Sequence, residues 1–243
     1  MCISTQVTII LLLIILIVYN IFKEKNQESF SNLPHHAFYM WGMKPDESKP
    51  CPRQNIEKNN KFIPGRVVGP KEIEPLLSQY PNPELAKIWP QIPKWIVKAD
   101  LGRLVYLYFH GGFYFDIDCK INKNFLNDIN QDTILFTEFI LESTDRLGPR
   151  EIKDDAHKLR VANYAMGSIK KNNKFYQKCI EECIRRLKTV LSEGNEINNT
   201  DVLWVCGPDV ITTMYHKLNK NEKNKVLLLP EKVVENENFG SWR

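Results

Sequence analysis

The stretch Lys98–Cys119, KADLGRLVYLYFHGGFYFDIDC, constrains the fold of this chain more than any other part of it. Its first half is apolar at nearly every position, which predicts a buried helix. That helix carries Asp100 and Arg103, which are three residues apart and therefore neighbours on one face. Buried charges need partners, and a ligand with hydroxyl groups would supply them. Gly111 and Gly112 then predict the end of the helix and a sharp reversal with positive φ angles.

Two aspartates, Asp116 and Asp118, follow a short aromatic strand at the end of this stretch. Side chains at i and i+2 of a strand point to the same side, so both carboxylates are predicted to face one site while Ile117 faces the core. Two like charges so close repel unless a cation lies between them or one carboxyl stays protonated. Carboxylate oxygens suit Mg²⁺ or Mn²⁺. We therefore predict a divalent metal and a phosphate-bearing ligand here.

Short strands and helices alternate through the rest of the chain, which predicts an α/β layered fold with a largely parallel sheet. Proline at the first turn supports the predicted helices at 70–79 and 83–89. The other predicted helices cover 93–110, 175–191 and 209–218, with a weaker one at 52–60. Strands are expected at 37–41, 65–69, 113–121, 133–137, 202–206 and 226–229.

The N-terminus carries a strongly apolar segment, almost wholly Ile, Leu and Val over residues 7–18 and apolar with interruptions from 3 to 22. A helix of about 20 residues crosses the hydrocarbon layer of a bilayer. The segment lacks a basic flank before it and a small-x-small cleavage site after it, which favours an uncleaved anchor over a signal peptide. We predict an anchor and short stem over 1–26, then one domain over 27–243.

This anchor predicts a single-pass membrane protein of an ER- or Golgi-like compartment or of a host or viral membrane. The side of the membrane stays open, because Lys23 and Lys25 favour a cytoplasmic domain while Glu24 offsets them. The net charge of +4 is small and scattered, so we do not expect nucleic acid as a partner. Six cysteines without a C-x-x-C pair argue against a zinc site.

The segment Lys98–Asp118 resembles the sugar-binding region of glycosyltransferase family 32. That family includes yeast outer-chain mannosyltransferases and inositol-phosphoceramide mannosyltransferases, and it is distantly similar to the large clostridial glucosylating toxins. Four flanking segments fall in the family's order. Leu33–Gly42 resembles its I-P-K-x-x-H-x-x-W strand, Val161–Ser168 its N-x-x-x-G-S segment, Val205–Pro208 its T-G-P turn, and Gly240–Trp242 its G-S-W end.

The resemblance implies a GT-A fold, a UDP- or GDP-sugar donor, a divalent metal (Mn²⁺ or Mg²⁺) and retention of anomeric configuration. It also implies roles for single residues. Trp41 would stack on the nucleotide base, and Asp100 and Arg103 would hydrogen-bond the hydroxyls of the donor sugar. Asp116 would contact ribose and sugar, and Asp118 would bind the metal directly, with Asp116 as the second candidate ligand. Except for Trp41, these residues are also the catalytic candidates.

By the same resemblance, Ser241 and Trp242 would close over the diphosphate from the C-terminal tail. The nucleophile stays open. Retaining enzymes of this fold often have no evident carboxylate in that position, and attack by the acceptor from the front face is the usual proposal for them. Glu138 and Asp209 are the candidates that this chain offers.

We therefore predict a hexosyltransferase that acts on a glycan, glycolipid or protein acceptor. A second interpretation is a non-catalytic protein of the same fold that binds nucleotide sugars or glycans. Turnover of a donor would separate the two. A third interpretation is a metal-dependent phosphohydrolase or nucleotidyltransferase, which would also use D-x-D and would cleave simple phosphoesters. No glycine-rich phosphate loop supports it.

Overall fold

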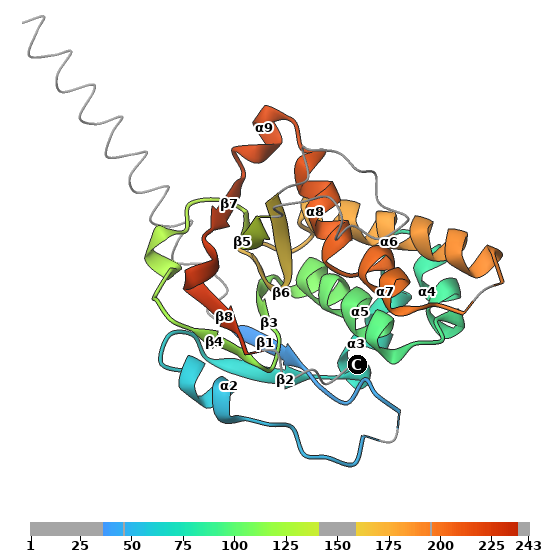
Figure 1. Cartoon of the computed structure of the whole chain (residues 1–243), viewed down its shortest axis with the longest axis horizontal. Helices are drawn as coiled ribbons and strands as arrows, with labels where there is room; N and C mark the ends of the chain where they lie inside the picture. The colour runs from blue at the N-terminus through green and yellow to red at the C-terminus, as the bar shows by residue number, and fades with distance from the viewer. Residues whose placement is uncertain (1–35, 46, 141–158, 195, 238–243) are drawn as a thin grey trace, which may run out of the picture. The chain divides into compact units, whose positions relative to one another are not determined.

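The structure is a computed structural model, and it describes residues 36–45, 47–140, 159–194 and 196–237 (Figure 1). These ranges lie in one compact unit of the chain. The predicted anchor and stem, the segment 141–158, and the tail residues Ser241 and Trp242 lie outside the described residues. Within the described ranges, no helix is long and apolar enough to span a membrane.

A six-stranded sheet forms the centre of this unit, in the spatial order β2-β1-β3-β6-β5-β7. Three neighbouring pairs are parallel, β1 with β2, β1 with β3, and β5 with β7. The α/β class is confirmed, but the prediction of a largely parallel sheet is wrong, because β6 runs antiparallel to both β3 and β5. The strands are β1 (Ala37–Met40), β2 (Gly65–Val68), β3 (Gly112–Phe115), β5 (Thr133–Ile140), β6 (Leu159–Ser168) and β7 (Val226–Leu229).

Helices lie at the positions that the apolar pattern predicts, except that the short helix α9 was not predicted and that one helix replaces a predicted strand. The described helices are α2 (Gln54–Asn59), α3 (Pro70–Leu77), α4 (Glu84–Ile88), α5 (Trp95–His110), α6 (Lys174–Ser192), α7 (Asn199–Val205), α8 (Pro208–His216) and α9 (Lys220–Lys223). Short 3₁₀ turns are η1 (Trp89–Gln91), η2 (Leu126–Asp128) and η5 (Glu231–Val233).

Segment 202–206 was predicted as a strand, but residues 202–205 form the end of helix α7 and Cys206 is its C-cap. The cause is local. The Asn198 side chain accepts a hydrogen bond from the backbone N–H of Asp201, and the Asp201 carboxylate accepts one from the N–H of Asn198. This capping box satisfies two donors at the start of the helix and so favours helix over strand. Gly207 and Pro208 then start α8 at once.

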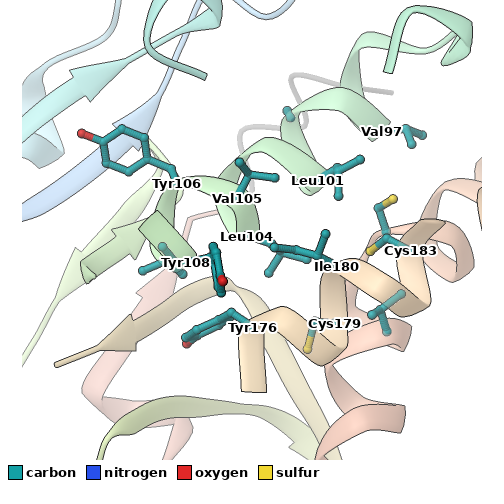
Figure 2. Close-up of a cluster of buried hydrophobic side chains, with 14 of the residues drawn as sticks. Val97, Leu101, Leu104, Val105, Tyr106, Tyr108, Tyr176, Cys179, Ile180 and Cys183 are labelled. Carbon is teal, nitrogen blue, oxygen red and sulfur yellow. The ribbon is translucent and has the colours of Figure 1, made fainter. Parts of the chain in front are cut away.

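Helix α5 lies in the middle of the hydrophobic core, as its nearly continuous apolar sequence predicts. Eleven of its sixteen residues are buried, among them the charged pair Asp100 and Arg103. Helix α6 packs on α5 through its apolar face, which includes Cys179, Ile180 and Cys183 (Figure 2). Because α5 is held on several sides, the two charges that it carries are fixed in position.

Two glycines turn the chain from α5 into β3. Gly111 has a φ of +67° and Gly112 a φ of +88°, which confirms the predicted reversal. A Cβ atom on Gly112 would also lie 2.8 Å from the ring and the carbonyl oxygen of His36. The reversal folds β3 back along the helix that it follows. Asp116, the residue after β3, therefore lies beside Arg103 in the middle of α5.

The strand expected at 113–121 is interrupted. β3 ends at Phe115, Asp116–Asp118 form a turn, and β4 (Cys119–Ile121) leaves the main sheet. The N–H of Cys119 donates to the carbonyl of Asp116 at 2.9 Å, which closes the turn. β4 then pairs antiparallel with β8 (Val234–Asn236) in a separate two-stranded sheet. The two aspartates therefore lie on a turn and not on a strand.

A buried amide, Asn59 at the end of α2, fixes the exit from this turn. Its Nδ2 donates to the Cys119 carbonyl at 2.9 Å and to the Tyr39 hydroxyl at 3.1 Å, and its Oδ1 accepts from the N–H of Ile121 at 2.9 Å. One side chain thus joins β1, β4 and α2. Each of the buried backbone groups would lose its partner if the amide were removed.

We predict that Asn59→Ala lowers the free energy of unfolding by about 2–4 kcal/mol, because it leaves buried donors and acceptors unsatisfied. The neighbouring Asn60→Ala is a matched control, since Asn60 is exposed and accepts only from the N–H of Gly65 at 2.9 Å. That variant should change the free energy by less than about 1 kcal/mol. Urea unfolding followed by circular dichroism measures both, and equal losses would contradict the role of Asn59.

Candidate functional site

An open cleft of about 910 Å³ runs between the centre of α5, the strand β6, the start of α8 and the β4–β8 sheet. Three of the predicted site residues, Asp100, Arg103 and Asp116, line it together, and so do the two nucleophile candidates, Glu138 and Asp209. The further polar side chains that line it are Asn122, Arg160, Asn163, Tyr164, Thr200, Glu231, Lys232, Glu235 and Asn236.

Arg103 joins two of the predicted carboxylates. Its Nη2 lies 2.8 Å from Asp100 Oδ1 on the same helix, and its Nη1 lies 3.1 Å from Asp116 Oδ1 in the turn. Nη1 also donates to the carbonyl of Asn163 in β6 at 2.9 Å. A planar guanidinium can hold several acceptors at fixed angles, which an ammonium group cannot. Arg103 thus ties α5, the D-x-D turn and β6 together.

Tyr114 is a second support of Asp116. It lies two residues earlier in β3, is fully buried, and donates its hydroxyl to Asp116 Oδ1. The guanidinium of Arg103 lies 4.6 Å from the centre of its ring, within the range of a cation–π contact. Burial raises the pKa of Tyr114 well above its ordinary value. The hydroxyl therefore stays protonated and can donate a hydrogen bond. Both donors meet one oxygen of Asp116, Oδ1, which fixes the orientation of the carboxylate.

Asn163 completes the network from β6. Its Nδ2 donates to Asp100 Oδ1 at 3.2 Å. Asp100 is buried, and burial raises its pKa, with Asp116 adding to the rise and Arg103 opposing it. For Arg103, burial opposes the charge, yet Tyr114 and the two aspartates still raise the pKa of the guanidinium. The arginine therefore stays charged while the pKa of Asp100 is raised.

Exposure differs sharply among these groups. The side chains of Asp100 and Arg103 are each 6% exposed, whereas that of Asp116 is 29% exposed. Asp116 is therefore the member of the network that a ligand in the cleft reaches most easily. Asp100 and Arg103 also line the cleft but are less exposed, and Arg103 holds the Asp116 carboxylate in place.

Asp118, the second aspartate of D-x-D, lies in the turn and interacts with neighbouring groups. Its carbonyl accepts a hydrogen bond from the N–H of Glu237 at 3.0 Å. Glu237 is also held by Asn55, whose Nδ2 donates to its carboxylate at 2.9 Å. The last described residue of the chain is thus bonded to the D-x-D turn.

Another predicted site residue, Trp41, stands apart from this group. Trp41 follows β1, is half-buried, and donates its indole N–H to the carbonyl of Lys49 at 3.2 Å. It is not one of the described residues that line the cleft. Ser241 and Trp242 lie outside the described residues. Base stacking by Trp41 and closure by the tail stay predictions.

Tyr114 and Asn163 were not predicted as site residues, although the sequence contains a signal for each of them. Tyr114 precedes Asp116 by two positions in a strand, where alternation puts the two side chains on one side. Asn163 is the single strongly polar residue in an otherwise apolar strand segment. A buried polar side chain needs a partner, and here the partner is Asp100.

The residues around the turn fit a divalent metal that a ligand shares. In the part of the chain that the structure describes, no three or more His, Cys, Asp or Glu side chains are grouped to hold a metal by themselves. Asp116 keeps Oδ2 beside the bonded Oδ1, and Asp118 adds a second carboxylate. Mg²⁺ is usually bound by one or two carboxylates plus phosphate and water. This donor set suits that arrangement.

The segment that carries most of this site resembles a known family. Residues 22–136, somewhat less than half of the chain, match a family model described as "Glycosyltransferase sugar-binding region containing DXD motif". The matched segment contains the D-x-D formed by Asp116 and Asp118, and also Asp100, Arg103 and Tyr114. A search of curated proteins found no significant match.

Solved structures show weaker likeness. The chain is 18% identical to the PaToxG glycosyltransferase over 82% of its own length and 76% of that chain, with a TM-score of 0.44. It is 12% identical to the ligand-free glycosyltransferase domain of the YGT toxin, over 73% of its length and 55% of that chain, with a TM-score of 0.45. It is 13% identical to a CTP:phosphocholine cytidylyltransferase from Streptococcus pneumoniae, over 83% and 92% of the two chains, with a TM-score of 0.31.

The sequence match covers the helix, the reversal and the turn that build the Arg103 network. Residues 22–136 therefore match a glycosyltransferase sugar-binding region, with the D-x-D motif at Asp116-Ile117-Asp118, and the protein is a transferase enzyme.

Proposed function

We propose that this enzyme is a metal-dependent, retaining glycosyltransferase that moves a hexose from a UDP- or GDP-sugar to a glycan, glycolipid or protein. The single observation that carries the proposal is the buried network of Arg103, Asp100 and Asp116 at the wall of an open cleft, next to the D-x-D turn. Buried charges of this kind are costly to keep without a ligand that uses them.

The network has the chemistry to hold a donor sugar. Asp116 presents a carboxylate to the cleft whose orientation is fixed by Arg103 and Tyr114. Fixed acceptors of this kind select hydroxyl groups by position, since a hydroxyl that misses its partner loses a hydrogen bond in a partly dry site. Asp100 and Asn163 lie behind it and provide further polar groups along the same wall.

Asp118 and Asp116 would hold Mn²⁺ or Mg²⁺ together with the diphosphate of the donor. A bound cation would neutralise the charge that builds on the leaving diphosphate. In the transfer, the bond from the anomeric carbon to the phosphate oxygen breaks while the acceptor oxygen bonds to that carbon on the same face. The hydroxyl proton of the acceptor leaves with the nucleoside diphosphate.

The C-terminal tail supports the same assignment. Glu237 is bonded to the D-x-D turn, and Ser241 follows four residues later. We propose that Ser241 and Trp242 close over a diphosphate at Asp118, since an extended chain of four residues can span up to about 14 Å. Trp41 is proposed as the platform for the nucleotide base.

We further propose that the chain is a GT-A enzyme close to glycosyltransferase family 32 and its mannosyltransferase group. It would be held in a membrane by the apolar segment 3–22. The resemblance of Lys98–Asp118 to that family's sugar-binding region supports the first part, and the composition of the N-terminus supports the second.

The direct test is a donor screen with the purified full-length protein, in which release of nucleotide is measured for UDP- and GDP-sugars with Mn²⁺ or Mg²⁺. Release from one donor that stops with EDTA and returns with the metal is the expected result. Donor binding without release of nucleotide would favour a binding protein, and cleavage of simple phosphoesters would favour a phosphohydrolase.

We predict that Asp118→Asn lowers metal-dependent release of nucleotide at least about 100-fold, since an amide is a weaker ligand for a hard cation than a carboxylate. The matched control is Asp128→Asn. Asp128 is an exposed carboxylate ten residues later, whose ion pair with Lys123 is 4.0 Å long. The Asp128→Asn variant should have the same activity as the wild type. Full activity in Asp118→Asn with an unchanged thermal midpoint would refute the metal assignment.

We also predict that Tyr114→Phe weakens binding of the donor about 10-fold or more, because Asp116 loses one of the two donors that orient it. Isothermal titration with the donor and metal measures this effect. Tyr176→Phe is the control, since its hydroxyl is also buried but donates to the carbonyl of Gly167 at 2.8 Å, away from the cleft. Equal donor affinities of the two variants would show that Tyr114 does not position Asp116.

A further inference from the structure

We propose that the part of the cleft built on Glu138, Arg160 and Asp209 is the acceptor subsite, and that it takes an uncharged sugar rather than a phosphorylated polyol. This inference rests on the proposed transfer from a donor at the Arg103 network, and it names the acceptor class that the sequence left open. Glu138 accepts a hydrogen bond from a hydroxyl of that sugar.

The three side chains form a second charged cluster that the donor site does not use. Arg160 Nε lies 2.9 Å from Glu138 Oε2, and Arg160 Nη1 lies 2.7 Å from Asp209 Oδ1. Glu138 comes from β5, Arg160 from β6 and Asp209 from the first turn of α8. All three line the cleft. A site assembled from three separate elements in this way is rigidly placed.

In this cluster one cation is shared by two carboxylates. Arg160 and Asp209 are nearly buried, whereas the side chain of Glu138 is 25% exposed. Asp209 Oδ1 has no hydrogen bond of good geometry among the described residues, despite its short distance to the guanidinium. Burial raises the pKa of Glu138, with Asp209 adding to the rise and Arg160 opposing it. Glu138 is thus the member of the cluster that is most exposed to the cleft, and its carboxylate can accept hydrogen bonds from sugar hydroxyls.

Strand β6 carries residues of both clusters along the wall of one cleft. Asn163 belongs to the Arg103 network and Arg160 to the second cluster, and both side chains line the cleft. Tyr164 also lines it, and its carbonyl accepts a hydrogen bond from the N–H of Asp116 at 2.8 Å. A donor sugar at Asp116 and an acceptor sugar at Glu138 would therefore occupy the same cleft.

The walls beside the second cluster are apolar, which suits the flat, non-polar face of a sugar ring. Phe139, Leu203 and Pro208 line the cleft there, and the guanidinium of Arg160 lies 5.9 Å from the ring centre of Phe139. Ligand sites generally combine apolar walls with a few placed polar groups. This combination fits a ring with hydroxyls at its edge.

The charge of the cleft selects against anionic acceptors. Among the described residues, six carboxylates line it, but only three cationic side chains do. Two of those cations, Arg103 and Arg160, already contact two carboxylates each. A phosphate group placed near Glu138 would meet like charge at short range. An uncharged sugar would not.

Transfer to defined probes tests the acceptor class. The donor is first identified by release of nucleotide without acceptor, which tests the proposed function separately. The full-length enzyme is then given the methyl glycosides of glucose, galactose and mannose, or glucose 6-phosphate and inositol 1-phosphate as anionic probes. Transfer to at least one methyl glycoside, with the anionic probes at background, is expected. Preference for a phosphorylated probe, or no transfer to any methyl glycoside, would overturn the inference.

The variant Glu138→Gln tests the residue. Its KM for the best methyl glycoside should rise about tenfold or more, while its dissociation constant for the donor stays within about twofold. Glu182→Gln is the matched control. It breaks a carboxylate–arginine contact on α6 outside the cleft, where Glu182 Oε1 lies 2.8 Å from Arg186 Nε, and should leave both constants unchanged.

Both variants are compared by thermal unfolding, so that a loss of stability is measured apart from a loss of acceptor binding. An unchanged KM for the acceptor in Glu138→Gln would refute the assignment. So would a rise in KM that is matched by an equal loss of affinity for the donor, because that result would place Glu138 in the donor site.

Discussion

The Arg103 guanidinium is the interaction on which the site depends. It is buried in the core, and it contacts Asp100 on its own helix, Asp116 in the D-x-D turn and a carbonyl of β6. Removing one partner of such a buried group commonly costs about 3–5 kcal/mol, because a charge is left without compensation. The burial of α5 is what makes the network rigid, since the helix that carries the charge has little freedom to move.

The turn between β3 and β4 places Asp116 in contact with Arg103. β3 has to end at Phe115 so that Asp116 can reach Arg103, and β4 then leaves the main sheet to pair with β8. Asn59 holds the far side of the turn through three hydrogen bonds. The pairing of β4 with β8 also brings Glu237 to Asp118. One short segment thus joins the Arg103 network to the start of the C-terminal tail.

The parts of this arrangement that sequence could predict are those set by local pattern. The buried helix, its charged pair and the glycine reversal follow from apolar periodicity and from the φ angles open to glycine. The break after Phe115 was not predictable, because three more strand-forming residues follow and the competing partner, β8, is more than 100 residues away. The strand predicted at 202–206 failed because the capping box of Asn198 and Asp201 outweighed β-propensity.

The antiparallel strand β6, which the prediction of a largely parallel sheet missed, matters most for function. Because β6 lies between β3 and β5, it contacts the D-x-D turn at one point and Glu138 at another. The Asn163 carbonyl and side chain belong to the Arg103 network, and Arg160 belongs to the cluster with Glu138 and Asp209. One strand therefore carries residues of both clusters, which on our proposal bind the sugar that is transferred and the sugar that receives it.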